Sequence, residues 1–211
     1  MRTIMFVTLM AVVVTGHLSA SSDNQQHSQP QDSIREGDII FQESQSELST
    51  AIQLATHSKY SHCGIILRKD GQLFVYEAIQ PVQYTPLQEW VSRGKGGHYV
   101  IRRLKNEQLV TPAMADRMKV AGKKYEGKNY DFYFRWSDDR IYCSELVWKI
   151  YKQAAGIEIG TLQALKDFDL NSVAVKKQMK EIYDNNIPYE EMIISPDNMF
   201  HSELLKTVKE Q

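Results

Sequence analysis

The sequence predicts an α+β domain in which an antiparallel sheet packs against helices. The clearest signal is a β-hairpin. Two apolar runs, at residues 63–67 and 73–79, flank Lys69-Asp70-Gly71-Gln72, and Asp-Gly between such runs favours a tight two-residue turn. Helical patterns with start and stop residues occupy other parts of the chain. Hairpin-linked strands mixed with helices in this way are typical of the α+β class.

The elements on either side of the hairpin follow from local patterns. Residues 37–41 (Gly-Asp-Ile-Ile-Phe) predict a short buried strand, and residues 44–57 are expected to form a helix because their apolar side chains recur at helical spacing. Thr85-Pro86 predicts a short helix that runs to Trp90, with the threonine as N-cap and the proline at the first helical position. Residues 98–104 are expected to form a further strand.

The second half of the chain predicts an aromatic, acidic loop and four helices with recognisable ends. In order, these are a helix from Thr111-Pro112 to about Glu126 that stops at Gly127, the loop at 130–140, a helix at 142–155 that stops at Gly156, a helix capped by Asn171 that runs to about Tyr183, and a short helix that starts at Ser195-Pro196.

The first 35 residues are expected to lie outside the folded domain, which spans 36–211. Residues 1–20 have the layout of a secretory signal peptide: Arg2, an apolar run at 3–15 and small residues up to Ala20. An uncleaved N-terminal anchor is the alternative. Residues 21–35 are polar and read as a disordered leader. We therefore expect a bacterial protein that is periplasmic or secreted and keeps no stable membrane anchor after cleavage.

The length and net charge of the chain limit the classes of binding partner that we expect. The chain has 211 residues, enough for one domain with a sizeable core, and its formal net charge is −1, from 25 Lys+Arg and 26 Asp+Glu. No basic stripe points to nucleic acid. Near-neutrality also argues against electrostatic attraction to anionic lipid. We expect a small peptide or acyl amide as the binding partner and no cofactor, and the oligomeric state stays open.

Cys143 is the candidate nucleophile, because it lies at the start of the predicted helix 142–155. Backbone N–H groups there have no intrahelical partner and the helix dipole is positive, so a thiolate is favoured. The same N–H groups can bind the oxyanion of an acyl-transfer intermediate. A buried core cysteine is the alternative that this position alone leaves open.

His62 and Glu77 emerge as a base and its orienting partner from the register of the hairpin. If Asp70-Gly71 is the turn, position i pairs with 141 − i, and both residues lie on one face as diagonal neighbours about 7–8 Å apart at Cα. Gly64, on the same face, leaves space for the carboxylate. His57, His98 and His201 are the other candidate bases, and each has a simpler structural role.

Cys63 offers competing interpretations. In an oxidising compartment, two cysteines first suggest a disulfide. The register places Cys63 on the face opposite His62, so a Cys143 that approaches His62 is expected to lie away from Cys63, which disfavours that bond. A zinc site built from His57, His62 and the cysteines lacks the paired ligand spacing that such sites use.

These motifs together resemble a known family. Tyr60-Ser61-His62-x-Gly64 on a strand, an acidic residue on the next strand and Tyr142-Cys143-Ser144-Glu145-Leu146-Val147 at a helix start are similar to the permuted papain-like amidases of the NlpC cell-wall peptidase superfamily, closest to the YaeF/YiiX type. Further segments that carry the resemblance are 37–42, 51–58, 136–140 and 186–188.

The resemblance implies a circularly permuted papain-like (NlpC-type) fold, with an antiparallel sheet packed against the helix of the nucleophile. It implies Cys143, His62 and Glu77 as catalytic triad. Tyr60 and Ser144 are the residues we expect to contact substrate or the oxyanion. The function it implies is that of an exported thiol amidase or peptidase that acts through a thioester, with murein-derived peptides as substrate. Alternatives are a lipid amide or ester hydrolase or acyltransferase on the same fold, a non-catalytic module that binds amino acids or peptides, and a structural domain.

Overall fold

The computed structural model describes residues 34–211, in which a six-stranded antiparallel sheet has the strand order β4-β3-β2-β1-β5-β8. The strands are β1 (Ile39–Gln42), β2 (His62–Lys69), β3 (Gln72–Glu77), β4 (Gln83–Pro86), β5 (Tyr99–Leu104) and β8 (Leu205–Glu210). A two-stranded sheet is formed by β6 (Gln163–Ala164) and β7 (Met192–Ile193). The α+β class and the antiparallel sheet are confirmed.

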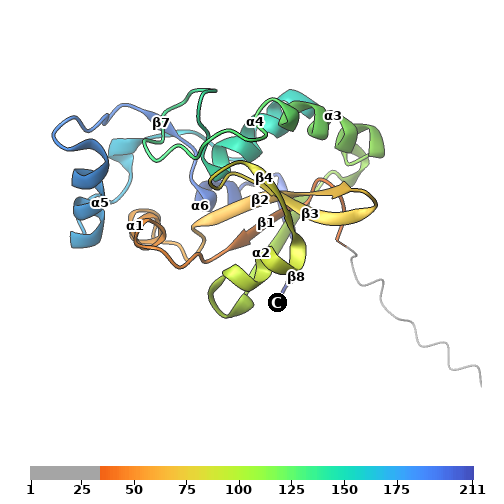
Figure 1. Ribbon diagram of the computed structural model, residues 1–211, viewed down its shortest axis with the longest axis horizontal. Helices are drawn as coiled ribbons and strands as arrows, with labels where there is room; N and C mark the ends of the chain where they lie inside the picture. The colour runs from red at the N-terminus through yellow and green to blue at the C-terminus, as the bar shows by residue number, and fades with distance from the viewer. Residues whose placement is uncertain (1–33) are drawn as a thin grey trace, which may run out of the picture. The chain divides into compact units, whose positions relative to one another are not determined.

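The α-helices of this part of the chain are α1 (Glu47–Thr56), α2 (Leu87–Arg93), α3 (Pro112–Lys123), α4 (Cys143–Ala155), α5 (Val173–Tyr183) and α6 (Pro196–Phe200). Three short 3-10 turns connect elements: η1 (Lys95–Gly97), η2 (Glu107–Leu109) and η3 (Leu165–Asp167). In Figure 1, α3 and α4 cover one face of the sheet, α2 lies against the other, and α1 and α5 stand side by side beyond one end of it.

Side chains from the two faces of the sheet enter two separate apolar clusters, as strand alternation requires. Ile39, Phe41 and Cys63 point toward α4 and join the larger cluster, which includes Leu146 and Ile150. Trp90 of α2 lies in the smaller cluster on the other face, which also includes Ile40, Ile66, Val75, Tyr99 and Ile101. The sheet is therefore buried on both faces, and α4 packs directly on β2.

The central hairpin has the predicted register. Ile65 pairs with Tyr76 and Lys69 with Gln72, so position i faces 141 − i. Asp70 and Gly71 form the turn with φ of 51° and 78°, the two positive values that a tight hairpin turn needs. Gly64 is also required: a Cβ there would approach Val75 Cγ1 to 2.4 Å and Glu77 Cβ to 3.3 Å.

Several predicted helix ends are confirmed and others are wrong; α3, for example, ends at Lys123 rather than at about Glu126. Thr111 and Ser195 cap α3 and α6 as expected, and Gly156 ends α4 in the left-handed conformation. Thr85, however, lies in β4 rather than at an N-cap, since Pro86 takes that position before α2.

The cap of α5 is Ser172 rather than Asn171, because the Ser172 hydroxyl accepts from the Val175 N–H. Strand β8 had no sequence signal, since only its pairing with β5 defines it.

A buried ion pair joins the start of β1 to β5. Arg103 donates to both carboxylate oxygens of Asp38 at 2.6 and 2.8 Å, and both side chains are fully buried. The two charges satisfy one another, which is the arrangement that allows ions in a core.

No helix within residues 34–211 is long and apolar enough to cross a membrane. The predicted signal peptide and most of the predicted leader lie outside the described residues.

Candidate active site

The site forms where β3 separates from β2. The pairing of the two strands stops at Ile65 and Tyr76, although β2 continues back to His62. The Ile66 N–H donates to the carbonyl of Asp38, the residue just before β1, so by alternation the Cys63 N–H points toward the side of β3. No β3 residue pairs with it there, and this N–H instead donates to the Cys143 sulfur. The Cys143 thiol therefore lies beside β2 at the point where its pairing with β3 ends.

Cys143 is the first residue of α4, with Tyr142 as N-cap in an extended conformation. Its side chain is buried, at 2% exposure, in the core beneath the sheet. Free N–H groups of the first turn and the positive end of the helix dipole lie beside the sulfur. The sequence-based expectation of a helix-start thiol therefore matches the position of this residue.

His62 lies between Cys143 and Glu77. Its Nε2 is 2.6 Å from Glu77 Oε2, so Nδ1 is the nitrogen that faces the Cys143 side chain, with which the ring shares a hydrogen bond. The ring also stacks on Trp90, with centroids 5.9 Å apart and an interplanar angle of 25°. Both contacts hold the imidazole in one orientation.

Glu77 is fully buried and accepts hydrogen bonds on both carboxylate oxygens. Besides His62, its donors are the Thr85 hydroxyl at 2.5 Å, the Trp90 indole N–H at 2.9 Å and the Arg93 guanidinium. Four donors occupy the four acceptor directions of the carboxylate. Glu77 is thus kept ionised and cannot rotate away from the histidine.

Charge at the site is arranged for a thiolate–imidazolium pair. Hydrogen bonds from Cys63 lower the Cys143 pKa well below its usual range, and the positive His62 lowers it further against the effect of burial. Burial alone would lower the His62 pKa, but the Cys143 thiolate and then Glu77 outweigh it and raise the pKa to about 10. Burial opposes ionisation of Glu77, yet His62, Thr85 and Arg93 keep its pKa below the usual value.

The expected separation of the two cysteines is wrong. Cys63 does lie on the face opposite His62, but the Cys143 side chain interacts with both His62 and Cys63. The Cys63 and Cys143 side chains share a hydrogen bond, and both thiols are free. Alternation along a strand places neighbouring side chains on opposite faces of the sheet. It does not prevent a third residue at the end of the strand pairing from contacting both of them.

Tyr60 and Ser144 have structural contacts. Tyr60 stacks on Phe200 of α6 with centroids 4.1 Å apart, and the described contacts do not join it to Cys143. The Ser144 hydroxyl donates to the Ile194 carbonyl at 2.7 Å, which fixes the start of α4 against the segment after β7. Ser144 nevertheless lines the cavity beside Cys143.

The other candidate histidines pair with surface carboxylates. His57, His98 and His201 lie 3.3, 3.2 and 3.4 Å from Asp169, Glu210 and Asp197 respectively. These contacts agree with their expected structural roles.

Tyr130 was missed by the sequence analysis. Its side chain shares a hydrogen bond with Cys143, and burial, together with the negative thiolate, raises its pKa, so it stays a hydroxyl and donates. The only sequence signal was an aromatic, acidic loop with several tyrosines and phenylalanines. Which of these reaches the thiol is decided by the bridge between Tyr130 and Ile141, just before α4.

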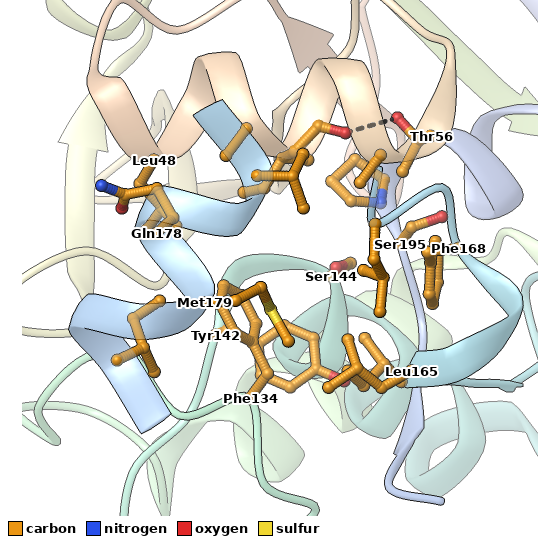
Figure 2. Close-up of a pocket in the computed structure, with 18 of the residues that line it drawn as sticks. Leu48, Thr56, Phe134, Tyr142, Ser144, Leu165, Phe168, Gln178, Met179 and Ser195 are labelled. Carbon is orange, nitrogen blue, oxygen red and sulfur yellow. Dashed lines mark hydrogen bonds between the residues drawn. The ribbon is translucent and has the colours of Figure 1, made fainter. Parts of the chain in front are cut away.

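Two hollows meet at the thiol and the imidazole. A cavity lined mainly by apolar side chains reaches Cys143, and Thr56, Ser144, Gln178 and Ser195 are the polar residues of its lining. Figure 2 shows its side chains converging from α1, α5 and the segment around Leu165 and Phe168. A more open cleft lies beside His62 and includes Gln42, Ser44 and Arg93. Tyr130 lines both hollows.

This fold and this arrangement define the class of the protein. Along the chain, the strand of His62 comes first, the strand of Glu77 second and the helix that starts at Cys143 third. This is the order of elements in the permuted papain-like amidases. Residues 33–209 match the model of the permuted papain-like amidase enzyme, YaeF/YiiX, C92 family. The chain belongs to this family.

Two similar proteins support the assignment. The uncharacterized protein YiiX of Escherichia coli (strain K12) is 47% identical over 175 residues, which cover 83% of this chain and 86% of that protein. A crystal structure described as the metalloprotein yiiX from Escherichia coli O157:H7, DUF1105, superimposes with a TM-score of 0.81 at 46% identity and covers 84% of this chain and 97% of that one.

The described part of the chain offers no set of ligands of the kind that a metal ion would need. Within residues 34–211, no group of three or more His, Cys, Asp or Glu side chains is placed to hold a metal ion. Glu77, the carboxylate beside His62, already accepts four hydrogen bonds. The described residues therefore do not fit a metal centre.

Proposed function

We propose that this protein is a cysteine amidase that removes a long-chain acyl group from a polar amine. The apolar cavity beside Cys143 is the observation that carries the proposal, because an acyl chain is the part of a substrate that such a lining would bind. The polar cleft beside His62 would receive the leaving amine. The substrate class is thus an N-acyl amide with one apolar and one polar end.

In the first half-reaction the Cys143 thiolate attacks the amide carbonyl. The His62 imidazolium then donates its proton to the leaving amine, and a thioester remains on Cys143. In the second half-reaction neutral His62 takes a proton from water, which attacks the thioester and releases the fatty acid. Glu77 keeps Nε2 protonated throughout, so that Nδ1 exchanges the proton.

The oxyanion that forms in each half-reaction needs donors near the sulfur. The backbone N–H of Cys143, at the unpaired start of α4, and the hydroxyl of Tyr130 are the groups we assign to it. Tyr60 and the Ser144 hydroxyl, the residues expected from the resemblance, have other partners.

Cleavage of murein-derived peptides is the second candidate. Its support is the cleft beside His62, whose amide and hydroxyl side chains could bind a peptide backbone. The apolar lining beside Cys143 has no evident use in that reaction. We therefore place it behind acyl-amide cleavage.

A chain-length series separates the two candidates. Wild type and Cys143→Ala would be incubated with N-butanoyl-, N-octanoyl- and N-dodecanoyl-glycine and with digested murein, and products measured by mass spectrometry. Each buried CH₂ contributes about 0.8 kcal/mol, so kcat/KM should rise up to about fourfold per CH₂ while the cavity accepts the chain.

Equal rates for butanoyl and dodecanoyl probes, or turnover of murein alone, would contradict the acyl proposal. Tight binding of the dodecanoyl probe without product from wild type would instead support a non-catalytic binding module.

We also propose that the protein acts outside the cytoplasm. The support is the apolar run at residues 3–15 behind Arg2, which is typical of a secretory signal. Intact-mass analysis of a periplasmic extract should show loss of about twenty residues from the N-terminus. Recovery of the full-length chain from the membrane fraction would contradict cleavage.

A further inference from the structure

Cys63 is a buried thiol that the proposed reaction does not use as nucleophile or base. It directly follows His62 on β2, has no exposed surface, and faces the α4 side of the sheet. Its side chain shares a hydrogen bond with Cys143, and its N–H donates to the same sulfur. Two free thiols are therefore in contact inside one site.

We infer that Cys63 is a resolving thiol, which converts peroxide-oxidised Cys143 into a reversible Cys63–Cys143 disulfide. The inference needs only a reactive Cys143 thiolate and does not depend on which acyl substrate the protein cleaves. The oxidised protein is inactive and protected, and a dithiol reductant restores it.

The first step is the oxidation of Cys143 by hydrogen peroxide. The thiolate attacks one peroxide oxygen, the O–O bond breaks, and the departing hydroxide takes a proton from the His62 imidazolium to become water. Cys143 is left as a sulfenic acid. A thiolate held beside a positive imidazole is the form that reacts in this way.

In the second step the Cys63 sulfur attacks the sulfenic sulfur. The S–O bond breaks, the Cys63 proton leaves with the hydroxyl as water, and the disulfide forms. Burial and the negative Cys143 thiolate hold the Cys63 pKa well above its usual range before oxidation. A sulfenic acid is neutral, so oxidation removes this second cause and makes Cys63 a better nucleophile at the moment when it is needed.

The local structure favours this bond over further oxidation. The two side chains already interact directly, so the disulfide forms without a further reactant, whereas sulfinic acid formation needs a second peroxide molecule to reach Cys143. Without Cys63, the sulfenic acid would persist and proceed to sulfinic acid, which thiol reductants do not reverse.

The experiment compares full-length wild type with Cys63→Ser, which keeps the size and a hydrogen-bond donor, and with Cys143→Ser. Each protein is treated with a few equivalents of hydrogen peroxide, alkylated and digested with trypsin without reduction. The informative peptides are 60–68 and 141–149, which carry one cysteine each. Intact mass is recorded before and after dithiothreitol.

Wild type should lose about 2 Da and give the two peptides linked, and dithiothreitol should reverse both changes. Cys63→Ser should gain about 32 Da on peptide 141–149 and stay modified after dithiothreitol. Cys143→Ser should keep its mass, because Cys63 alone is not expected to react.

A wild type that gains about 32 Da without linked peptides would overturn the inference. So would equal recovery of wild type and Cys63→Ser by dithiothreitol. If Cys63→Ser does not fold, the wild-type peptide map still decides between the linked and the overoxidised product. Failure of acyl-amide turnover would leave this result unaffected, so the two proposals fail separately.

Discussion

Replacing Glu77 by glutamine tests whether its charge sets the protonation state of His62. The substitution keeps the size of the side chain but removes the negative charge that lies 2.6 Å from Nε2 in a fully buried position. The glutamine NH₂ can also donate to Nε2, which would place the ring proton on Nδ1. An imidazole in that form cannot accept a proton at the nitrogen that faces Cys143.

The size of the effect follows from the hydrogen bond that is lost. Bonds to charged groups contribute about 1.5–3 kcal/mol, which corresponds to a kcat about 10- to 150-fold lower. The same energy is about 1–2 pH units in the titration of His62. Its pKa of about 10 should therefore fall to about 8–9, and the alkaline limb of the kcat/KM profile should move with it.

The measurements are the pH dependence of kcat/KM with the preferred acyl-glycine and the NMR titration of the His62 ring, assigned by its absence in His62→Ala. Glu89→Gln, an exposed change on α2, is the matched control and should leave both unchanged. An unshifted alkaline limb and an unchanged kcat in folded Glu77→Gln would refute the role of the charge. A double variant with His62→Ala should be little worse than His62→Ala alone.

Four further predictions test other parts of the molecule. In wild type, turnover should require deprotonated Cys143 and protonated His62. Activity should therefore stay level through neutral pH, fall above about pH 10, and decline on the acid side only well below the usual thiol pKa. Iodoacetamide at mildly acidic pH should label Cys143 and spare Cys63. Tyr130→Phe should lower kcat about 10²–10³-fold with a small change in KM, as expected for an oxyanion donor. A rise in KM with an unchanged kcat would contradict that role. Ala55→Phe, which fills part of the apolar cavity from α1, should reduce kcat/KM for dodecanoyl-glycine far more than for butanoyl-glycine, whereas Ala113→Phe on the exposed side of α3 should affect neither. Asp38→Ala should lower the free energy of unfolding by about 3–5 kcal/mol in urea, because it removes the buried carboxylate that accepts two hydrogen bonds from Arg103. Asp116→Ala, at an exposed position, serves as control, and a similar small loss in both would show that the buried pair does not stabilise the fold.

The local patterns of the sequence determined the central hairpin and most helix ends. Asp70-Gly71 specifies its turn because few residues adopt two successive positive φ angles, and the turn then sets the pairing of every residue along β2 and β3. His62 and Glu77 follow from that pairing alone. Helix starts at Thr111 and Ser195 were equally readable, since a cap is a contact between residues three apart.

Contacts between distant segments could not be read in this way. The sequence predicts Thr85 as an N-cap, but Thr85 lies in β4, where its hydroxyl donates to the carboxylate of Glu77. Strand β8 exists because β5 offers an edge to pair with, and its own residues carry no apolar alternation. In both cases a tertiary partner outweighs a local preference of about 1 kcal/mol or less.

The surroundings of the thiol were decided by tertiary structure alone. The sequence placed Cys143 at a helix start, but only the packing of α4 against the end of the β2–β3 pairing brings its thiol to both His62 and Cys63. The apolar cavity has the same origin, since α1, α5 and α4 each contribute part of a wall. A sequence pattern reports which face of an element is buried, whereas the hollow between three elements depends on how they pack.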